Sequence, residues 1–418
     1  MSHDTPTAPA TPAGPRSLIL PQPLWTESGE VLPEVHVGYE TWGRLAPDRS
    51  NAVLVLHALT GDSHVAGPAG PGFPTPGWWD GLIGPGRTLD TDRYFVVAPN
   101  ALGGCRGTTG PASPGPGGRA WGSRFPRLTV RDQVTAEVAG ADLLGIERWA
   151  AVVGGSMGGM RAVEWAVTHP DRVGALFLIA TTAAASAEQI AWCSTQLHAI
   201  RADPGWAGGD YHDRPAESGP WRGLGLARRI AHVTYRSEPE LATRFGRGRQ
   251  AGEGPHGRYA VESYLDHHAA KLTARFDAGS YVSLTEAMNS HDVGRDRGGV
   301  AAALARITAP TVVAAVDSDR LYPPSQQQTL ADGIPGAGPL RVVESPYGHD
   351  GFLIELDQVA PLLAELLERT ANTDPNRTPN RAAAPPPTPT PHPGRPGDRT
   401  GNPGRTRNTE LDPTVTRR

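Results

Sequence analysis

Short apolar runs and longer amphipathic segments alternate along the central part of the chain. The apolar runs of strand length are residues 52–57, 94–98, 149–155, 175–180 and 311–316, and a last strand is indicated at 340–344. Runs of this kind predict strands that are buried on both faces, as in a parallel sheet. Residues 130–144 show the apolar spacing of a helix and lead into the third run. The alternation predicts an α/β fold with a mostly parallel central sheet.

Two segments depart from this alternation. Residues 34–42 alternate between apolar and polar positions, which predicts an exposed antiparallel strand ahead of the parallel ones. Residues 184–300 carry helical patterns, many Arg and His, and Gly-rich joints. Because this stretch separates two predicted strands, we expect a helical lid inserted over the carboxyl ends of the sheet. The core is therefore expected in two parts, residues 17–183 and 301–370.

A nucleophile motif ends the third apolar run. Residues 154–158 are Gly-Gly-Ser-Met-Gly, which fits the G-x-S-x-G pattern of a strand that turns sharply into a helix. A serine hydroxyl is a weak nucleophile, so this turn has to hold it beside a base and beside donors for an oxyanion. Glycines are needed because a Cβ at the flanking positions would collide with the backbone. Residues 157–167 fit the following helix, so Ser156 is a candidate nucleophile.

The motif requires an acid and then a histidine further along the chain. Asp317 and Asp319 come directly after the predicted strand 311–316, and His349 comes after the predicted strand 340–344. Catalytic groups of open α/β sheets lie at the carboxyl ends of the strands. The sequence therefore predicts a triad of Ser156, His349 and one of the two aspartates.

Composition narrows the classes of function. The 418 residues carry a net charge of −4 without a central basic block, which argues against a nucleic-acid partner. The two cysteines are too few for a disulfide framework and lack metal-ligand spacing, so we expect a cytoplasmic protein without a metal. No signal peptide is evident, and no apolar run reaches the roughly 18 residues of a membrane helix. Residues 1–16 and 371–418 are Pro-rich, and we expect both to be disordered.

A set of collinear motifs extends over most of the chain. In order, they are residues 56–61, 99–111, 125–132, 154–160, 227–235, 275–281, 318–323 and 347–352. In this order they resemble the homoserine O-acetyltransferases, the acyltransferase branch of the α/β-hydrolase fold, from about residue 18 to residue 367. G-x-S-x-G alone is shared with esterases and lipases. The whole set is much more specific.

The resemblance implies a role for each matching residue of the triad. Ser156 would be the acylated nucleophile and His349 its base. The acid of the family lies in an S-D-x-L-[FY]-P element, which here selects Asp319 over Asp317.

The resemblance also implies residues that bind the oxyanion and the substrate. The backbone N–H groups of Leu59 and Met157 would form the oxyanion hole. Arg228 would bind the carboxylate of the acceptor and Asp350 its ammonium group, with Tyr235 nearby. A guanidinium suits a carboxylate because it can bind both oxygens at once.

The activity implied is the transfer of an acetyl group from acetyl-CoA to L-homoserine through an acyl-enzyme, in methionine biosynthesis. Acetyl-CoA would be a co-substrate, with no bound cofactor, and the family resemblance suggests a homodimer joined through lid helices. Two alternatives stay open, a homoserine O-succinyltransferase and a carboxylester hydrolase. An esterase would turn over p-nitrophenyl acetate without benefit from an amino-acid acceptor.

One position departs from the family pattern near the expected rim of the lid. Residues 291–299 contain Asp296 where the family usually has glycine. The long Pro-rich segment after residue 371 is also unusual for the family.

Overall fold

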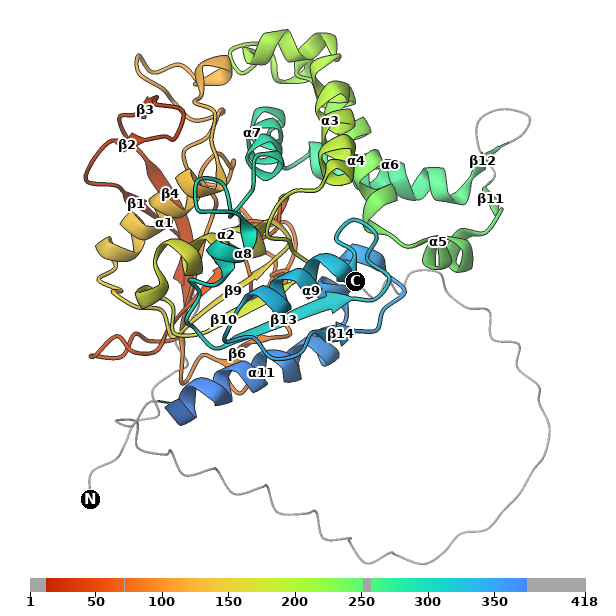
Figure 1. The fold of residues 1–418 in the computed structure, drawn as a ribbon. Helices are drawn as coiled ribbons and strands as arrows, with labels where there is room; N and C mark the ends of the chain where they lie inside the picture. Colours follow the sequence, from red (N-terminus) through yellow and green to blue (C-terminus); the bar gives the residue numbers. More distant parts are fainter. Residues whose placement is uncertain (1–12, 71, 251–256, 374–418) are drawn as a thin grey trace, which may run out of the picture. The chain divides into compact units, whose positions relative to one another are not determined.

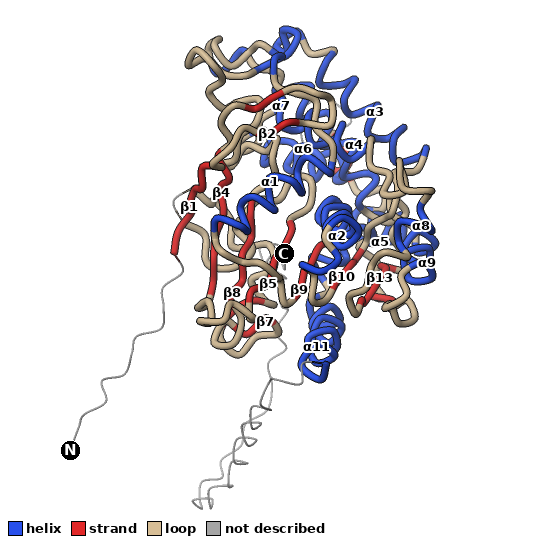
Figure 2. The backbone as a smooth tube through the Cα atoms, turned by 60° about the vertical axis from the view of Figure 1, so that its left-hand side comes forward, coloured by secondary structure: helices blue, strands red, loops and turns tan. Residues whose placement is uncertain are grey.

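The computed structural model describes residues 13–70, 72–250 and 257–373. Its main sheet has eight strands. Figure 2 labels those from β1 to β13, which lie side by side. Across the sheet they are β1 (Ala13–Ile19), β4 (His36–Trp42), β8 (Phe95–Pro99), β5 (Ala52–Leu56), β9 (Ala151–Gly155), β10 (Leu176–Ile179), β13 (Thr311–Val316) and β14 (Arg341–Val343). The strands from β8 to β14 are parallel, and β4 is antiparallel to β1 and β8. The predicted mostly parallel sheet is confirmed.

Helices cover both faces of this sheet. One face packs against α1 (Val130–Leu143), α2 (Met157–Thr168), α8 (Val300–Leu304) and α9 (Pro324–Gly333). The other face packs against α11 (Leu356–Thr373), which follows the short α10 (Gly351–Ile354). Along β5, Leu54 belongs to the first core and Val53 to the second. Because successive side chains point to opposite faces, a strand covered on both sides is apolar throughout.

The segment between β10 and β13 is largely helical. Its helices are α3 (Ala187–Arg201), α4 (Trp221–Tyr235), α5 (Glu238–Phe245), α6 (Ala260–Thr273) and α7 (Ala278–Asn289). Figure 1 shows α4 between α3 and α6, and both pairs are in contact. Leu197 and Leu224 of this helical insertion share a core with Leu59 and Met157, so it packs over the carboxyl ends of β5 and β9.

Short elements complete the described chain. The short strands are β2 (Leu24–Trp25), β3 (Val31–Leu32), β6 (Ile83–Gly84), β7 (Leu89–Asp90), β11 (Arg249–Gln250) and β12 (Arg258–Tyr259). The short 3₁₀ turns are Gly122–Arg124, Pro170–Arg172, Pro204–Gly209, Ala216–Ser218 and Gly348–Asp350. The β11–β12 hairpin lies within the insertion, where the sequence pattern indicated helices alone.

The prediction of an exposed strand at 34–42 is wrong in one respect. β4 is antiparallel as predicted, but it is buried, and Glu40 is only 3% exposed. The Glu40 carboxylate accepts hydrogen bonds from Ser63 Oγ (3.0 Å) and from His64 Nδ1 (3.0 Å). Burial raises the pKa of Glu40, against the opposing effect of His64. A loop that supplies polar partners thus covers the polar face of this strand.

The ends of the folded region differ from the predicted boundaries. β1 begins at Ala13, so residues 13–16 belong to a strand and not to the expected disordered segment. Pairing with β4 stabilises this edge strand, a long-range contact that local composition does not reveal. α11 continues to Thr373. The rest of the two predicted disordered segments, residues 1–12 and 374–418, lies outside the described residues.

Backbone conformation accounts for the usual glycine at position 296. Asp296 has a φ of 62°, in the left-handed region that side chains other than those of Asn and Asp rarely adopt. Its side chain is 77% exposed and lies 3.3 Å from Arg295 Nη1. The aspartate therefore occupies a conformation in which glycine is unstrained.

We predict opposite outcomes for two substitutions at this position. Asp296→Val should lower the free energy of unfolding by about 1–2 kcal/mol, because a β-branched side chain is strained at positive φ. Asp296→Gly should leave the stability close to that of the original chain. Urea unfolding followed by circular dichroism measures both, and a valine variant as stable as the glycine variant would contradict the explanation.

Candidate active site

Ser156 lies in a strained turn between β9 and α2. Its φ of 55° and ψ of −126° are unusual for a residue with a side chain. A Cβ on Gly154 would lie 2.2 Å from the carbonyl oxygen of Gly158, and a Cβ on Gly158 would lie 2.0 Å from that of Leu56. Both glycines are therefore required by close backbone contacts, as the motif predicted.

The structure brings Ser156, His349 and Asp319 into one hydrogen-bonded chain. His349 Nε2 lies 2.9 Å from Ser156 Oγ, and His349 Nδ1 lies 2.7 Å from Asp319 Oδ2. A carboxylate can only accept a hydrogen bond, so Nδ1 carries the proton and Nε2 is left to accept one from the serine. Each of the three residues is at most 4% exposed.

The two candidate aspartates have different partners. Asp319 accepts backbone hydrogen bonds from Leu321 and Tyr322, both 2.9 Å long, through Oδ1, which leaves Oδ2 for the histidine. Asp317 instead accepts a 2.9 Å hydrogen bond from the backbone N–H of Ser345 through Oδ1. The geometry thus pairs Asp319, and not Asp317, with His349.

Electrostatics favour the charged form of the His349 imidazole. Burial by itself would lower the pKa of His349, but the carboxylates of Asp319 and Asp350 oppose this effect, and the pKa is raised above 6.5. Tyr322 stacks on the ring at a centroid distance of 4.9 Å. The imidazole is therefore held in one orientation, and its protonated form is stabilised as a base of this kind requires.

Two backbone amides were predicted to form an oxyanion hole. Met157 is the first residue of α2, so its N–H belongs to the helix N-terminus, where the helix dipole favours negative charge. Leu59 lies in the segment after β5, which passes so close to Gly158 that no side chain fits between them. The Leu59 N–H donates no hydrogen bond to another backbone group among the described residues.

Arg228 and Tyr235 reach the same region from α4. The Arg228 guanidinium lies 5.6 Å from the centroid of the Tyr235 ring, whose centroid is 5.7 Å from that of His349. Arg228 Nη1 donates a 3.2 Å hydrogen bond to Thr60 Oγ1, while its Nε is buried without a partner in the described part of the chain. A half-buried guanidinium whose Nε–H has no acceptor is suited to an anionic ligand.

Asp350 is already paired in the structure. Its Oδ2 lies 3.1 Å from Nη1 of Arg236, whose Nη2 also bonds Glu240 Oε1 at 2.9 Å. The Arg236 side chain is 7% exposed, so this network is shielded from water. The sequence analysis did not identify Arg236 as a partner of the predicted ammonium-binding carboxylate. Its place directly after Tyr235 was the available signal.

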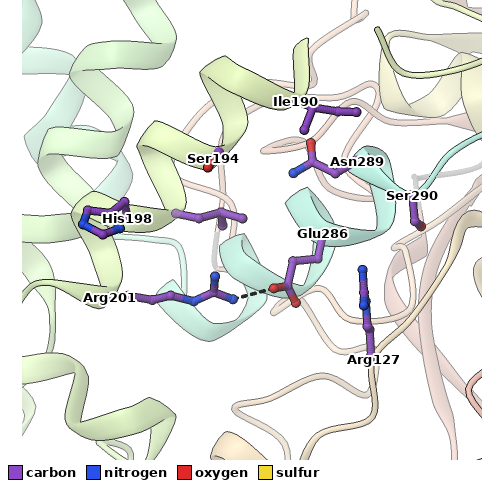
Figure 3. A pocket seen from close by; sticks show the side chains of 9 residues that line it. Arg127, Ile190, Ser194, His198, Arg201, Glu286, Asn289 and Ser290 are labelled. Carbon is purple, nitrogen blue, oxygen red and sulfur yellow. Dashed lines mark hydrogen bonds and ion pairs between the residues drawn. The ribbon is translucent and has the colours of Figure 1, made fainter. Parts of the chain in front are cut away.

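A cavity on the insertion is separate from these residues. It has a volume of about 390 Å³ and lies between α3 and α7, with Arg201 and Glu286 joined by an ion pair across it (Figure 3). Its walls are Arg127, Ile190, Ser194, Leu197, His198, Arg201, Glu286, Asn289 and Ser290. None of these is a predicted site residue, so the cavity does not mark the triad.

Within the described ranges, no group of three or more His, Cys, Asp or Glu side chains could hold a metal ion. No helix in the same ranges combines the length and hydropathy that a bilayer-spanning segment requires.

Comparison with known proteins identifies close relatives. The family model of the α/β hydrolase fold matches residues 51–356. The homoserine O-acetyltransferase of Thermobifida fusca (strain YX) is 65% identical over 378 residues, which cover 88% of this chain and 100% of the relative. The homoserine O-acetyltransferase of Mycobacterium tuberculosis (strain ATCC 25177 / H37Ra) is 57% identical over 366 residues, covering 87% and 96%.

Solved structures share the fold at lower identity. The homoserine O-acetyltransferase from Bacillus anthracis has a TM-score of 0.77 and 28% identity, covering 85% of this chain and 97% of that chain. Esterase E22 has the same TM-score and 26% identity, covering 84% and 99%. Both transferases and esterases therefore use this arrangement of sheet and helices.

We predict that acylation of Ser156 depends on pH through His349. Only the neutral imidazole can accept the serine proton, and its pKa is raised above 6.5. The rate of p-nitrophenol release from p-nitrophenyl acetate should therefore rise with pH, with a midpoint above 6.5. Asp350→Asn should move the midpoint to lower pH, because one of the raising charges is lost. A midpoint below 6.5 in the original chain would contradict this assignment.

The different contacts of the two aspartates generate a second prediction. Asp319→Asn should slow the same acylation by up to about 10⁴-fold, because an amide favours the wrong imidazole tautomer. Asp317→Asn should have little effect, since its amide oxygen can still accept from Ser345. Stopped-flow measurement of the two variants at one pH compares them, and the reverse order of effects would show that the acid is wrongly assigned.

Proposed function

The chain belongs to the homoserine O-acetyltransferase family, and we propose that it transfers the acetyl group of acetyl-CoA to the γ-hydroxyl of L-homoserine. The observation that carries this proposal is the chain of hydrogen bonds Asp319–His349–Ser156 beneath a helical insertion that supplies the half-buried Arg228. The identity of 57–65% to transferases supports transfer over hydrolysis.

The first half of the reaction acylates the enzyme. His349 Nε2 takes the proton of Ser156 Oγ as this oxygen attacks the thioester carbonyl of acetyl-CoA. The N–H groups of Leu59 and Met157 stabilise the oxyanion of the tetrahedral intermediate. The intermediate collapses with cleavage of the C–S bond, and the imidazolium returns its proton to the departing CoA sulfur. Asp319 stabilises the imidazolium throughout.

The second half transfers the acyl group to the acceptor. His349 takes the proton of the homoserine hydroxyl, whose oxygen attacks the acyl-serine carbonyl. The same two amides hold the new oxyanion, and collapse of the intermediate releases O-acetylhomoserine. The proton on His349 returns to Ser156 Oγ, so the triad is regenerated. The product carries an acetate leaving group in place of a hydroxyl, which is what a later step of methionine biosynthesis requires.

Charged side chains would orient the acceptor. Arg228 would bind the homoserine carboxylate, since its buried Nε–H has no acceptor among the described residues. Asp350 would bind the ammonium group through the oxygen that Arg236 does not occupy. Tyr235, whose pKa is raised to about 12 by burial, would remain neutral and form part of the wall. Asp350 directly follows His349, so this placement would bring the acceptor hydroxyl towards the base.

Exclusion of water would distinguish transfer from hydrolysis. The insertion shares a core with the oxyanion segment through Leu59, Met157 and Tyr281, and Tyr281 is fully buried. An oriented acceptor in such a site reacts as if present at roughly 10⁵ M or more, which exceeds the concentration of water. The insertion therefore acts as the lid of the active site in this proposal.

We also propose a cytoplasmic homodimer. Cys105 and Cys193 are both free, as expected in a reducing compartment. Exposed apolar side chains on α3 and α4 offer a contact surface, and they are Ile190, Trp192, Leu226 and Val233. The resemblance to the family supplies the expectation that a second copy covers them.

The proposal predicts a covalent acetyl group on Ser156. Enzyme mixed briefly with acetyl-CoA should gain about 42 Da on the peptide that contains Ser156, as expected for an acyl-serine intermediate. Mass spectrometry after acid quenching detects it, and Ser156→Ala is the control that should gain nothing. An unmodified peptide while product still forms would overturn the covalent mechanism.

The donor and acceptor are tested in the same assay. Purified protein given homoserine with acetyl-CoA should form O-acetylhomoserine far faster than it forms O-succinylhomoserine from succinyl-CoA. Preference for succinyl-CoA would establish the succinyltransferase alternative. Release of acetate at an equal rate with and without homoserine would instead establish an esterase.

A further inference from the structure

Two arginines of the insertion donate hydrogen bonds to Thr60, which directly follows Leu59 in the sequence. Arg228 of α4 donates to Thr60 Oγ1 at 3.2 Å, as described above. Arg275, in the connection between α6 and α7, donates from Nη2 to the backbone oxygen of Thr60 at 2.8 Å. The two bonds differ in kind, because one ends on a side chain and the other on the backbone of the oxyanion segment.

Hydrogen bonds to the core and within the turn fix the same segment near Ala58. His57 Nε2 accepts a 2.9 Å hydrogen bond from the backbone N–H of Ala101, and Nδ1–H donates to Ala58 O at 2.8 Å. The N–H of Gly61 closes a turn on the same Ala58 oxygen at 2.9 Å. Burial and nearby Arg161 lower the pKa of His57 to about 3, so this histidine is neutral. The segment is thus fixed from the core at Ala58 and from the insertion at Thr60.

Arg275 has no acidic partner within ion-pair distance in the described part of the chain. Burial lowers the pKa of Arg275, nearby Arg228 lowers it further, and Asp62 opposes both effects. Partial burial of one guanidinium beside another lowers the stability of the folded state. A single hydrogen bond to a neutral carbonyl compensates only part of this cost. The bond is better explained by what it positions.

We propose that Arg275 is a positioning residue of the oxyanion hole, which it acts on through the carbonyl of Thr60. The Thr60 carbonyl shares a peptide group with the Gly61 N–H, which bonds Ala58 O at 2.9 Å, and Ala58 O shares a peptide group with the Leu59 N–H. A fixed Thr60 carbonyl therefore helps to fix the direction of the Leu59 N–H through this hydrogen bond. The insertion thereby determines the geometry of acylation as well as the shape of the pocket. This inference rests on the proposed function for the role of Leu59, and it adds a residue that the triad does not include.

The test separates acylation from acceptor binding. Arg275→Gln should slow p-nitrophenol release from p-nitrophenyl acetate by about 10²-fold, the effect of a misplaced oxyanion donor. Its KM for homoserine in the transfer assay should stay close to that of the original chain. Arg228→Gln should do the reverse, raising the homoserine KM much more than it slows acylation. Arg229→Gln is the matched control, because Arg229 lies on the same insertion and bonds Asp266 at its surface.

Arg275→Lys provides a second reading if the glutamine variant does not fold. Lysine keeps the positive charge but lacks the rigid fork of the guanidinium, so its bond to the Thr60 oxygen should be weaker and not lost. We therefore expect a smaller loss of acylation than in Arg275→Gln, with an unchanged homoserine KM. Circular dichroism checks that each variant is folded. Acylation at the original rate in a folded Arg275 variant would overturn the proposal, as would a rise in homoserine KM without slower acylation. Because p-nitrophenyl acetate requires neither CoA nor homoserine, failure of the proposed function would appear instead as absent transfer by the original chain.

Discussion

The site depends on the close backbone approach between the start of α2 and the end of β5. Gly158 lies so near the carbonyl of Leu56 that a Cβ would be 2.0 Å from it, and Ser156 adopts a positive φ so that α2 can begin there. This approach presents the Ser156 hydroxyl and brings the Met157 amide beside the segment that contains Leu59. A side chain at Gly158 would force the start of α2 away from this segment. Close packing of the backbone therefore determines where the Ser156 hydroxyl and the proposed oxyanion amides lie.

The helical insertion contributes charge to a sheet edge that already carries the triad. Arg228 and Arg275 contact Thr60, while Arg236 contacts Asp350. Each of these contacts joins a positive charge of the insertion to a segment that ends a strand of the core. The insertion and the core are therefore not independent of each other, because side chains of the insertion bond the segments that follow the strands of the core.

Local pattern predicted the parts of the structure that local interactions determine. The uniformly apolar runs predicted the parallel strands, because every side chain of such a strand is buried. The glycines around Ser156 predicted the turn, because its close contacts involve residues near in sequence. The burial of Glu40 was not predictable in this way, since its partner His64 comes from a different loop. The bond from Arg275 to Thr60 spans 215 residues of sequence, and the pair Arg236–Asp350 spans 114. Such contacts exist only once the insertion is folded onto the core.

The fold by itself does not decide between transfer and hydrolysis, because esterase E22 shares it with a TM-score of 0.77. The triad does not decide either, since water and an amino-acid hydroxyl are deprotonated by the same base. The difference has to lie in groups that recognise a zwitterion and displace water from the acyl-serine. Arg228 and Asp350 have opposite charges. Arg228 lies on α4 of the insertion, whereas Asp350 lies beside His349 in the core. An acceptor that bridges them would complete the closure of the site, so binding of the second substrate and exclusion of water become one event.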